Sequence, residues 1–489
     1  MKLNNTNLAS LPADLPGYDR AGLRAGIVHF GVGNFHRAHQ AVYLDRLMNM
    51  GMGHDFAIIG AGVMPADTDA RAVLAGQDYL YSVTARSALA QDIRIIGAMI
   101  DYLAPGDAAA IIARLADPAI RIASLTITEG GYFLDAASGR FDAGHPAITA
   151  DAADPGAPGT VFGLLVAGLR ARRDAGVPPF TIMSCDNIPH NGHVTREAVV
   201  GTARLSDPAL ADWIAAHVAF PNAMVDRITP ATGPRERALI RKAGIGDDSP
   251  VFCEDFTQWV LEDHFPAGRP PLERVGVEFV GDVTPWEMMK IRILNGGHAL
   301  LAYPAGLMDI EFVHEAMEND LVRGFLTRVE EDEIIPVVPP VPGTDLHAYF
   351  ARVRERCANP MIGDTIRRLC LDGSNRQPKF IIPTIADRLA AGGAVTGLAL
   401  ASALWCRYCA GVTDSGAVIA PNDPAWGRLT GTALAARDDP RIWLEMRDIY
   451  GDTGQNPVFA QEFGHWLARL WQDGTAVTLR GYLDGGAQG

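Results

Sequence analysis

Three polar residues that could act on an alcohol, Lys290, Asn295 and His298, lie in one stretch with helical spacing. At about 100° per residue, their side chains fall within one broad face of the predicted helix. Only four of the 42 basic residues are lysines, so an internal lysine needs a chemical explanation. A buried lysine has a lowered pKa and can act as a base near neutral pH, whereas arginine keeps its proton. Lys290 is therefore predicted to be a general base, the alternative being a surface ion pair.

Two glycines, Gly296 and Gly297, stand between Asn295 and His298. Glycine is a poor helix residue, so we expect this pair to leave room for a group to approach the backbone. His298 alone would more often be a structural histidine. Beside Lys290 and Asn295, it is interpreted as a substrate contact.

A second asparagine, Asn187, follows a predicted strand that ends at Cys185. Ligands gather at the carboxyl ends of strands in open α/β sheets, so Asn187 is placed to stabilise a developing alkoxide together with Asn295. With a base, these groups suit hydride transfer from a secondary alcohol. Other routes are disfavoured, because the chain has no Tyr-x-x-x-Lys sequence and lacks the Cys and His spacing of a catalytic zinc site.

The nucleotide that such a reaction needs has a candidate site near the start of the chain. The first predicted strand is joined to a helix by a glycine-containing bend made of Gly31, Val32, Gly33, Asn34 and Phe35. Glycines here let the backbone approach a pyrophosphate at the helix N-terminus, although the third glycine of the usual fingerprint is missing. Asp67, beyond the second predicted strand, can accept hydrogen bonds from the adenosine ribose and would repel a 2′-phosphate. NAD is the expected cofactor; a simple tight turn and a solvated loop aspartate are the alternatives.

Short apolar runs alternate with helical stretches through the first half of the chain. Helical stretches lie at residues 34–49 and near 107–116, and strand-like runs lie at 26–31, 56–62, 79–85, 93–97, 122–128 and 180–185. This alternation predicts an α/β fold, with a Rossmann-type, doubly wound and largely parallel sheet covered by helices on both faces.

The pattern changes at Thr284, where Thr284, Pro285 and Glu287 form a good helix start. This helix should end before Pro304, because proline cannot continue a regular helix. Long helical segments follow, with few strand signals. We expect residues 1–283 to form the nucleotide-binding domain, with insertions, and residues 284–489 to form a mostly α-helical substrate and catalytic domain.

Bulk composition excludes several classes of protein. A net charge of −15 argues against nucleic-acid and anionic-membrane partners, and no apolar run reaches the roughly 18 residues of a membrane span. The first residues lack the apolar core of a secretory signal, so a cytoplasmic location with reduced cysteines is expected. No metal is expected at His29, His36 and His39, since the strand should point His29 away from the helix.

Several longer motifs resemble one known family, the polyol-specific long-chain dehydrogenases and reductases. They are Lys290-x4-Asn295-x2-His298, GNFHRAH near the start, TITEGGY, SCDNIPHNG, NAMVDRITP and LDGSNRQPKF. The resemblance runs through most of the chain and is strongest toward members that act on mannitol. It implies metal-independent, NAD-dependent interconversion of D-mannitol and D-fructose, with the polyol and ketose as small-molecule partners. We expect a monomer.

The same resemblance implies roles for individual residues. Lys290 would be the general acid and base, and Asn187 and Asn295 would form the oxyanion site. Glu129 would guide protons between Lys290 and solvent, and the substrate hydroxyls would be contacted by His298, Asp226, Arg368 and Arg376. Family members carry lysine at the last of these positions, so arginine there keeps the charge and changes the geometry. A surface ion pair is the alternative for Asp226 and for both arginines.

The closest alternative activity is that of a sibling reductase acting on fructuronate or tagaturonate, in which Arg368 and Arg376 would clamp a carboxylate. D-Arabinitol or sorbitol could also be accepted. A nicotinamide-binding protein without turnover and a metal hydrolase are alternatives of other classes. Polyol oxidation assays with and without a chelator would separate them.

Overall fold

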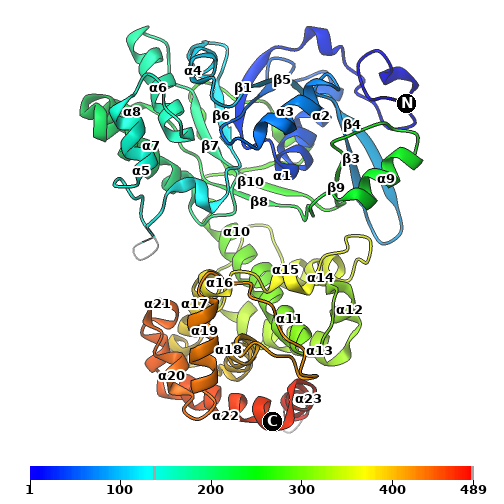
Figure 1. Cartoon of the computed structure of the whole chain (residues 1–489), viewed down its shortest axis with the longest axis vertical. Coiled ribbons are helices and arrows are strands. Elements are labelled where there is room, and N and C mark those ends of the chain that lie inside the picture. Colours follow the sequence, from blue (N-terminus) through cyan, green and yellow to red (C-terminus); the bar gives the residue numbers. More distant parts are fainter. Residues whose placement is uncertain (136–138, 486–489) are drawn as a thin grey trace. The chain divides into compact units, whose positions relative to one another are not determined.

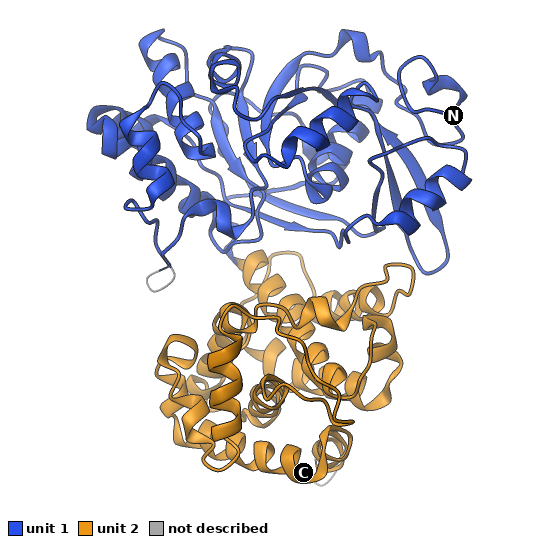
Figure 2. Ribbon diagram, viewed as in Figure 1, with its two compact units in different colours: residues 1–284 blue, residues 285–489 orange. Residues whose placement is uncertain are grey.

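The computed structural model describes residues 1–135 and 139–485. The chain divides into two compact units, Met1–Thr284 (unit 1) and Pro285–Gly489 (unit 2) (Figure 2). Unit 1 combines sheets with helices, and unit 2 is built from helices (Figure 1). The predicted fold class, an α/β domain followed by a mostly helical one, is therefore confirmed.

The central sheet of unit 1 has five parallel strands in the order β5-β2-β1-β6-β7. The chain starts in the middle of the sheet, builds outward to β5, and returns to β6 beside β1. The carboxyl ends of β1 and β6 therefore lie where the strand order reverses, which is where open α/β sheets bind ligands. The strands are β1 (Ala25–Phe30), β2 (Ala57–Ala61), β5 (Met99–Leu103), β6 (Ile122–Leu125) and β7 (Thr181–Ser184).

Two smaller sheets and a set of helices complete unit 1. The sheets have the orders β4-β3-β9 and β11-β10-β8. Their strands are β3 (Tyr81–Arg86), β4 (Gln91–Ile96), β8 (Ala223–Asp226), β9 (Val251–Glu254), β10 (Gln258–Glu262) and β11 (Glu278–Val280). The helices are α1 (Asn34–Ala38), α2 (Gln40–Asn49), α3 (Asp67–Ala75), α4 (Ala108–Ala116), α5 (Pro146–Ala153), α6 (Val161–Asp174), α7 (Asn191–Ser206), α8 (Pro208–His217) and α9 (Pro234–Lys242), with short 3₁₀ turns at Leu8–Ser10, Arg20–Gly22, Glu129–Tyr132 and Leu272–Val275.

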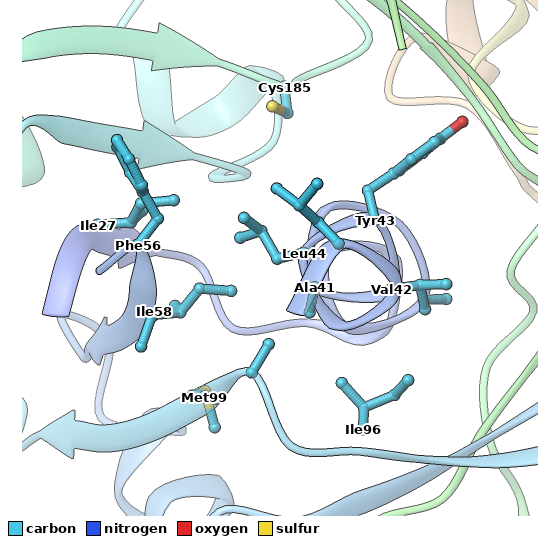
Figure 3. Packing of buried hydrophobic residues seen from close by; sticks show 14 of the residues in the cluster. Ile27, Ala41, Val42, Tyr43, Leu44, Phe56, Ile58, Ile96, Met99 and Cys185 are labelled. Carbon is cyan, nitrogen blue, oxygen red and sulfur yellow. The ribbon is translucent and has the colours of Figure 1, made fainter. Parts of the chain in front are cut away.

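Side chains of β1 alternate between two apolar cores, as the pleat of a strand requires. Ile27 packs with α2, whose Leu44 points toward it (Figure 3). Val28 and Phe30 pack on the opposite face with α4 and α6. The central sheet is thus buried on both faces, which explains why its strands are continuous apolar runs.

The predicted strands at 79–85 and 93–97 do not join the parallel sheet, which corrects that part of the prediction. They form β3 and β4, which pair antiparallel through a turn in which the Ser87 N–H donates to the Ala90 carbonyl (2.9 Å). Antiparallel strands need only a short connection, whereas parallel neighbours need a long crossover. The edge strand β5 was not predicted.

One helix was predicted over residues 34–49, but α1 ends at Ala38 and α2 begins at Gln40. The break lies at His39, which has φ −117° and ψ −91°. The Ala38 carbonyl accepts a hydrogen bond from Arg227 (2.6 Å), and the His39 ring bonds to the Gln258 carbonyl (2.9 Å). Both partners are distant in sequence, so local helix propensity could not reveal the break.

Unit 2 begins with a helical run that changes geometry twice. The helix α10 (Thr284–Met289) leads into a π-helical segment, Lys290–Asn295 (the first π segment), and then into α11 (Gly296–Leu307). Pro304 lies inside α11, so the predicted end of this helix was wrong. Proline removes one helix hydrogen bond, but the residues around it are nearly all buried, and their packing holds the helix together.

Several helices of unit 2 pack on α11 or α18, and α18 is buried along nearly its whole length. A helix that is apolar all round belongs in a core. A second π segment, Glu330–Ile334, follows α13. The other helices are α12 (Val313–Glu318), α13 (Asp320–Val329), α14 (Leu346–Cys357), α15 (Ile366–Leu369), α16 (Gly373–Phe380), α17 (Ile382–Ala390), α18 (Thr396–Cys409), α19 (Trp426–Ala435), α20 (Arg441–Leu444), α21 (Arg447–Tyr450), α22 (Pro457–Asp473) and α23 (Thr475–Gly485), with 3₁₀ turns at Ile335–Val337 and Thr453–Gln455.

Within residues 1–135 and 139–485, no helix is both long enough and apolar enough to cross a bilayer. All six cysteines are buried. Cys406 and Cys409 lie inside the core helix α18.

The N-terminus of α18 is held by Glu333, a buried residue of the second π segment. Its carboxylate accepts hydrogen bonds from the N–H groups of Gly397 (2.6 Å) and Leu398 (2.9 Å). Burial raises the pKa of Glu333 from its ordinary value of 4.5 to about 7, because the two hydrogen bonds only partly offset the loss of hydration.

Glu333 should therefore make the stability of the protein fall as pH rises from about 4.5 to about 7. Below this window both the folded and the unfolded chain bind the proton; within it only the folded chain does. The expected loss of unfolding free energy is on the order of 3 kcal/mol at most, since one pKa unit corresponds to about 1.4 kcal/mol. Urea unfolding of the Glu333→Gln variant across this range should show a flatter pH dependence than wild type. The exposed neighbour Glu331→Gln is the control, and an unchanged pH slope in Glu333→Gln would contradict the assignment.

Candidate active site

The turn after β1 is pressed against the end of β6. Gly31 has φ +89°, and a Cβ atom there would lie 2.0 Å from the Thr126 carbonyl oxygen. Thr126 Oγ1 donates to the Gly31 carbonyl (2.6 Å), and the Gly33 N–H donates to the same oxygen (2.7 Å). Val32 is buried and faces Gly60 of β2. Gly31 is thus required by the fold itself.

Gly33 is different, because the fold does not require a glycine there. Its φ is −90°, and a Cβ atom would meet nothing closer than the Gly31 carbonyl oxygen at 3.9 Å. The open space beside this backbone fits the close approach of a pyrophosphate, which is the reason for a glycine at this point of a nucleotide-binding turn. The predicted nucleotide site therefore has a cradle that a side chain would fill.

The side chains of Asn34 and Phe35 have partners in α1 and in more distant parts of unit 1. Asn34 Nδ2 donates to the Pro230 carbonyl (3.3 Å), and its Oδ1 accepts from Arg37 (2.7 Å). Phe35 stacks on His39, with ring centroids 4.9 Å apart. These contacts fix the turn, and direct contact of either side chain with a cofactor stays a prediction.

His29 does not point away from the helix, which corrects the sequence-based expectation. Its ring stacks on His36 at 3.4 Å between centroids and bonds to Ser124 Oγ (2.8 Å) and Thr126 Oγ1 (3.0 Å). Burial lowers the pKa of His29 to about 3, so the ring is neutral and supports the Gly31 turn. Among the residues that the structure describes, no group of three or more His, Cys, Asp or Glu could hold a metal ion.

Asp67 is the first residue of α3, and its carboxylate caps its own turn. Oδ2 accepts hydrogen bonds from the N–H groups of Val63 and Met64, both at 2.8 Å. This local role was not predicted. A contact between Asp67 and a ribose stays a prediction, and it would fall mainly to the other carboxylate oxygen.

Glu129, Asn187 and Asp226 follow or end strands of unit 1. Glu129 is exposed at the start of the 3₁₀ turn after β6, and Asn187 is exposed directly after β7. β6 and β7 are hydrogen-bonded neighbours, so both residues lie at the same edge of the central sheet. Asp226 is buried at the end of β8, opposite Gln258, and belongs to a different sheet.

Lys290 and Asn295 are the first and last residues of the first π segment, and His298 lies in the first turn of α11. A π-helix closes hydrogen bonds over five residues instead of four, so the α-helical spacing assumed for these residues does not hold. Lys290 is 7% exposed, whereas Lys2, Lys242 and Lys379 are all exposed. The structure therefore singles out the same lysine that the composition did.

The first π segment is anchored on both sides. Arg292 donates to the Val337 carbonyl (2.9 Å) and forms an ion pair with Asp387. A Cβ atom on Gly297 would lie 3.1 Å from Glu330 Oε1, so this glycine admits the second π segment. The room that the glycine pair was expected to leave is thus taken by packing within unit 2.

Glu330 was not predicted as a residue of interest. It is fully buried, and neither carboxyl oxygen has a hydrogen-bond partner among the described residues. Burial raises the pKa of Glu330 well above its ordinary value, because the charged carboxylate would lose its hydration there. The sequence signal for its burial is that Glu330 lies four residues after Leu326, a buried residue one helical turn earlier.

Arg368 and Arg376 come together on α15 and α16. Arg368 Nε donates to Asp364 Oδ1 (2.5 Å), and its NH2 group contacts Oδ2, so Asp364 holds the guanidinium bidentately. Arg376 donates to the Leu369 carbonyl (3.2 Å) at the end of α15. Both helices pack on α11, and α16 also packs on the first π segment. Unit 2 thus gathers five of the predicted site residues: Lys290, Asn295, His298, Arg368 and Arg376.

Comparison with known proteins assigns the family. Residues 25–274 match the mannitol dehydrogenase Rossmann domain, and residues 282–471 match the mannitol dehydrogenase C-terminal domain. The chain belongs to the mannitol dehydrogenase family. A mannitol 2-dehydrogenase of Cereibacter sphaeroides is 58% identical over 96% of this chain and 98% of the relative, and one of Aspergillus fumigatus is 42% identical over 99% of each.

Two solved structures have the same fold along nearly the whole chain. The Pseudomonas fluorescens mannitol 2-dehydrogenase, in a ternary complex with NAD and D-mannitol, is 45% identical with a TM-score of 0.89, covering 99% of this chain and 100% of that one. A D-sorbitol dehydrogenase in substrate-free form is 37% identical with a TM-score of 0.90, covering 98% and 100%. The predicted resemblance to polyol dehydrogenases is confirmed at the level of the family.

Proposed function

We propose that this chain catalyses the NAD-dependent oxidation of D-mannitol to D-fructose and the reverse reduction. It is an NAD-dependent polyol dehydrogenase of the mannitol 2-dehydrogenase type. The observation that carries the proposal is Lys290, the one buried lysine of the four in this chain, in a π-helical geometry that is frequent at functional sites. The 58% and 45% identity to enzymes named for mannitol supports the choice of substrate.

Lys290 supplies the acid–base chemistry in this proposal. In the oxidative direction its neutral amine takes the proton of the substrate hydroxyl, and in the reductive direction the ammonium returns it. Bound NAD would accept the hydride that leaves the carbon carrying this hydroxyl. Proton transfer is assigned to the lysine, so the reaction needs no metal-bound water.

The other site residues keep the roles implied by the resemblance. Asn187 and Asn295 donate amide hydrogen bonds to the substrate oxygen as it gains negative charge. Glu129 passes the proton between Lys290 and solvent. The remaining hydroxyls are contacted by His298, Asp226, Arg368 and Arg376.

The ion pair of Arg368 favours a neutral polyol over a hexuronate. Its guanidinium is already paired with the Asp364 carboxylate, so a substrate carboxylate would have to compete for it. Asp226 accepts hydrogen bonds from hydroxyls and would repel an acid at short range. We therefore prefer mannitol to the uronates, with arabinitol and sorbitol as slower substrates.

The turn at Gly31 and Gly33 would hold the pyrophosphate of NAD, and Asp67 would hold its adenosine ribose. A 2′-phosphate would meet the negative charge of Asp67, so NAD is preferred to NADP. A cytoplasmic location and a monomeric state remain predictions from the sequence.

Initial rates on a substrate panel test this function. We expect kcat/KM for fructose to exceed that for fructuronate and tagaturonate under identical conditions, NAD to outperform NADP, and activity to survive a chelator. A tenfold or larger advantage for either uronate would overturn the mannitol proposal and make Arg368 and Arg376 carboxylate ligands. Loss of activity on chelation would overturn the metal-independent mechanism.

A further inference from the structure

Asp186, the residue before Asn187, is a buried carboxylate that bonds to the segment carrying Glu129. Its Oδ2 accepts hydrogen bonds from the Ile127 N–H (3.0 Å) and the Tyr132 hydroxyl (2.7 Å), and its Oδ1 accepts from the Thr128 N–H (2.8 Å). The side chain is only 7% exposed. One carboxylate on the β7 side thus binds three donors on the β6 side.

The backbone that Asp186 holds is strained. Thr128 has φ 61° and ψ 167°, a region that essentially only glycine occupies without cost. A β-branched residue at positive φ is a clear outlier, and such strain persists only where surrounding contacts enforce it. The two N–H groups held by Asp186 belong to Ile127 and to Thr128 itself, and Glu129 comes next in the chain.

Two glycines near Thr128 could have adopted the positive φ without strain. Gly130 and Gly131 follow directly, yet the positive φ falls on Thr128 and neither glycine has one. Without the Asp186 carboxylate, Thr128 would relax to an ordinary conformation and redirect the residue after it. The clamp therefore holds the backbone from which the Glu129 side chain projects.

We propose that Asp186 is a positioning residue for Glu129, whose carboxylate it keeps at the carboxyl ends of β6 and β7 by holding the strained Thr128 backbone. This inference rests on the proposed proton-transfer role of Glu129. Asp186 touches neither substrate nor cofactor in this role; it acts through the peptide that precedes Glu129.

The test compares Asp186→Asn with a matched variant. Asp151 is equally buried and makes the same kind of clamp, accepting from the N–H groups of Gly159 (2.7 Å) and Thr160 (3.0 Å) and from the Thr160 hydroxyl (2.5 Å). Both substitutions should lower the melting temperature. We expect only Asp186→Asn to lower kcat, by roughly tenfold or more, with KM for NAD unchanged, because small displacements of a catalytic group are costly. Equal kcat in the two variants would overturn the proposal.

Rescue and a double-mutant cycle separate positioning from general damage. Thr128→Gly removes the strain, so adding it to Asp186→Asn should restore most of the lost kcat. In a Glu129→Gln background, Asp186→Asn should have little further effect on kcat, since the group that it positions is already gone. The assignment would be contradicted if Thr128→Gly failed to restore kcat, or if the effects of Asp186→Asn and Glu129→Gln on kcat simply multiplied. A Glu129→Gln enzyme with wild-type kcat would also contradict it.

Hydrogen exchange measures the clamp without any catalysis. Amides of residues 127–132 should exchange faster in Asp186→Asn than in wild type or Asp151→Asn. Unchanged exchange there would refute the clamp whatever the substrate is. Inactivity of the wild-type enzyme on polyols, with the exchange result as expected, would instead refute the proposed function.

Discussion

Replacing Lys290 by arginine should lower kcat by at least ~10²-fold, the low end for loss of a general base. Arginine keeps the positive charge and much of the length, but its guanidinium does not release a proton near neutral pH. The substitution therefore tests proton transfer and not charge. Lys290→Met, which has a similar shape and no charge, should be at least as inactive. The methionine variant shows whether activity is also lost without the steric effect of a larger guanidinium at this buried position.

The control for this experiment is Lys242→Arg, the same change at an exposed position at the end of α9. It should keep wild-type kcat, and both arginine variants should keep wild-type binding of NADH by fluorescence. Near-native turnover in Lys290→Arg would show that the proton is taken by another group and would refute the mechanism.

The two glycines of the nucleotide turn should respond in opposite ways to alanine. Gly31→Ala places a Cβ atom 2.0 Å from the Thr126 carbonyl oxygen at φ +89°, so we expect a loss of at least ~2 kcal/mol in unfolding free energy. Gly33→Ala adds a methyl group at φ −90° with no atom nearer than 3.9 Å, so stability should change by less than ~0.5 kcal/mol. The added methyl group should nevertheless raise KM for NAD by about tenfold, because it occupies the space where the backbone approaches a pyrophosphate.

Thermal or urea unfolding and cofactor titration, carried out on both variants, check this contrast. Gly33→Ala is the decisive variant, since its effect on NAD should appear without a loss of stability. Wild-type KM for NAD in that variant would remove the case for a cofactor at this turn. Wild-type stability in Gly31→Ala would contradict the close approach to Thr126.

The sequence predicted those parts of the molecule that local pattern determines. Alternating apolar runs gave four of the five central strands and the turn between β1 and α1, because each run is long enough to be recognised alone. The short connection between β3 and β4 suits an antiparallel pair, but β3 also pairs with β9, more than 150 residues later, and local pattern does not reveal that partner. The break at His39 has the same cause, since Arg227 and Gln258 determine it.

The sequence predicted site residues whose type is unusual in this chain, but not the backbone geometry that positions them. Lys290 stood out because lysine is rare in this chain, and it proved to be the buried one. The π geometry around Lys290 could not be predicted from residue spacing. Arg292, which lies in this segment, is anchored by Val337 and Asp387, and both of these residues lie elsewhere in unit 2. Asp186 was passed over because an aspartate beside an asparagine after a strand resembles an ordinary turn residue.

The first π segment makes the number of residues in this stretch as informative as their chemical types. A π turn holds one residue more than an α turn, so it behaves as a one-residue insertion inside a helix. In a regular α-helix each residue turns the chain by about 100°, whereas each residue of a π turn rotates it less. The direction of His298 relative to Lys290 therefore depends on the π geometry as well as on the residue types. Deleting one residue between Lys290 and Asn295 would allow a regular α-helix that keeps nearly the same relative direction but lacks the widened turn. A one-residue gap in this stretch of a related sequence would therefore mark a regular helix in place of the π turn, even where the motif letters agree.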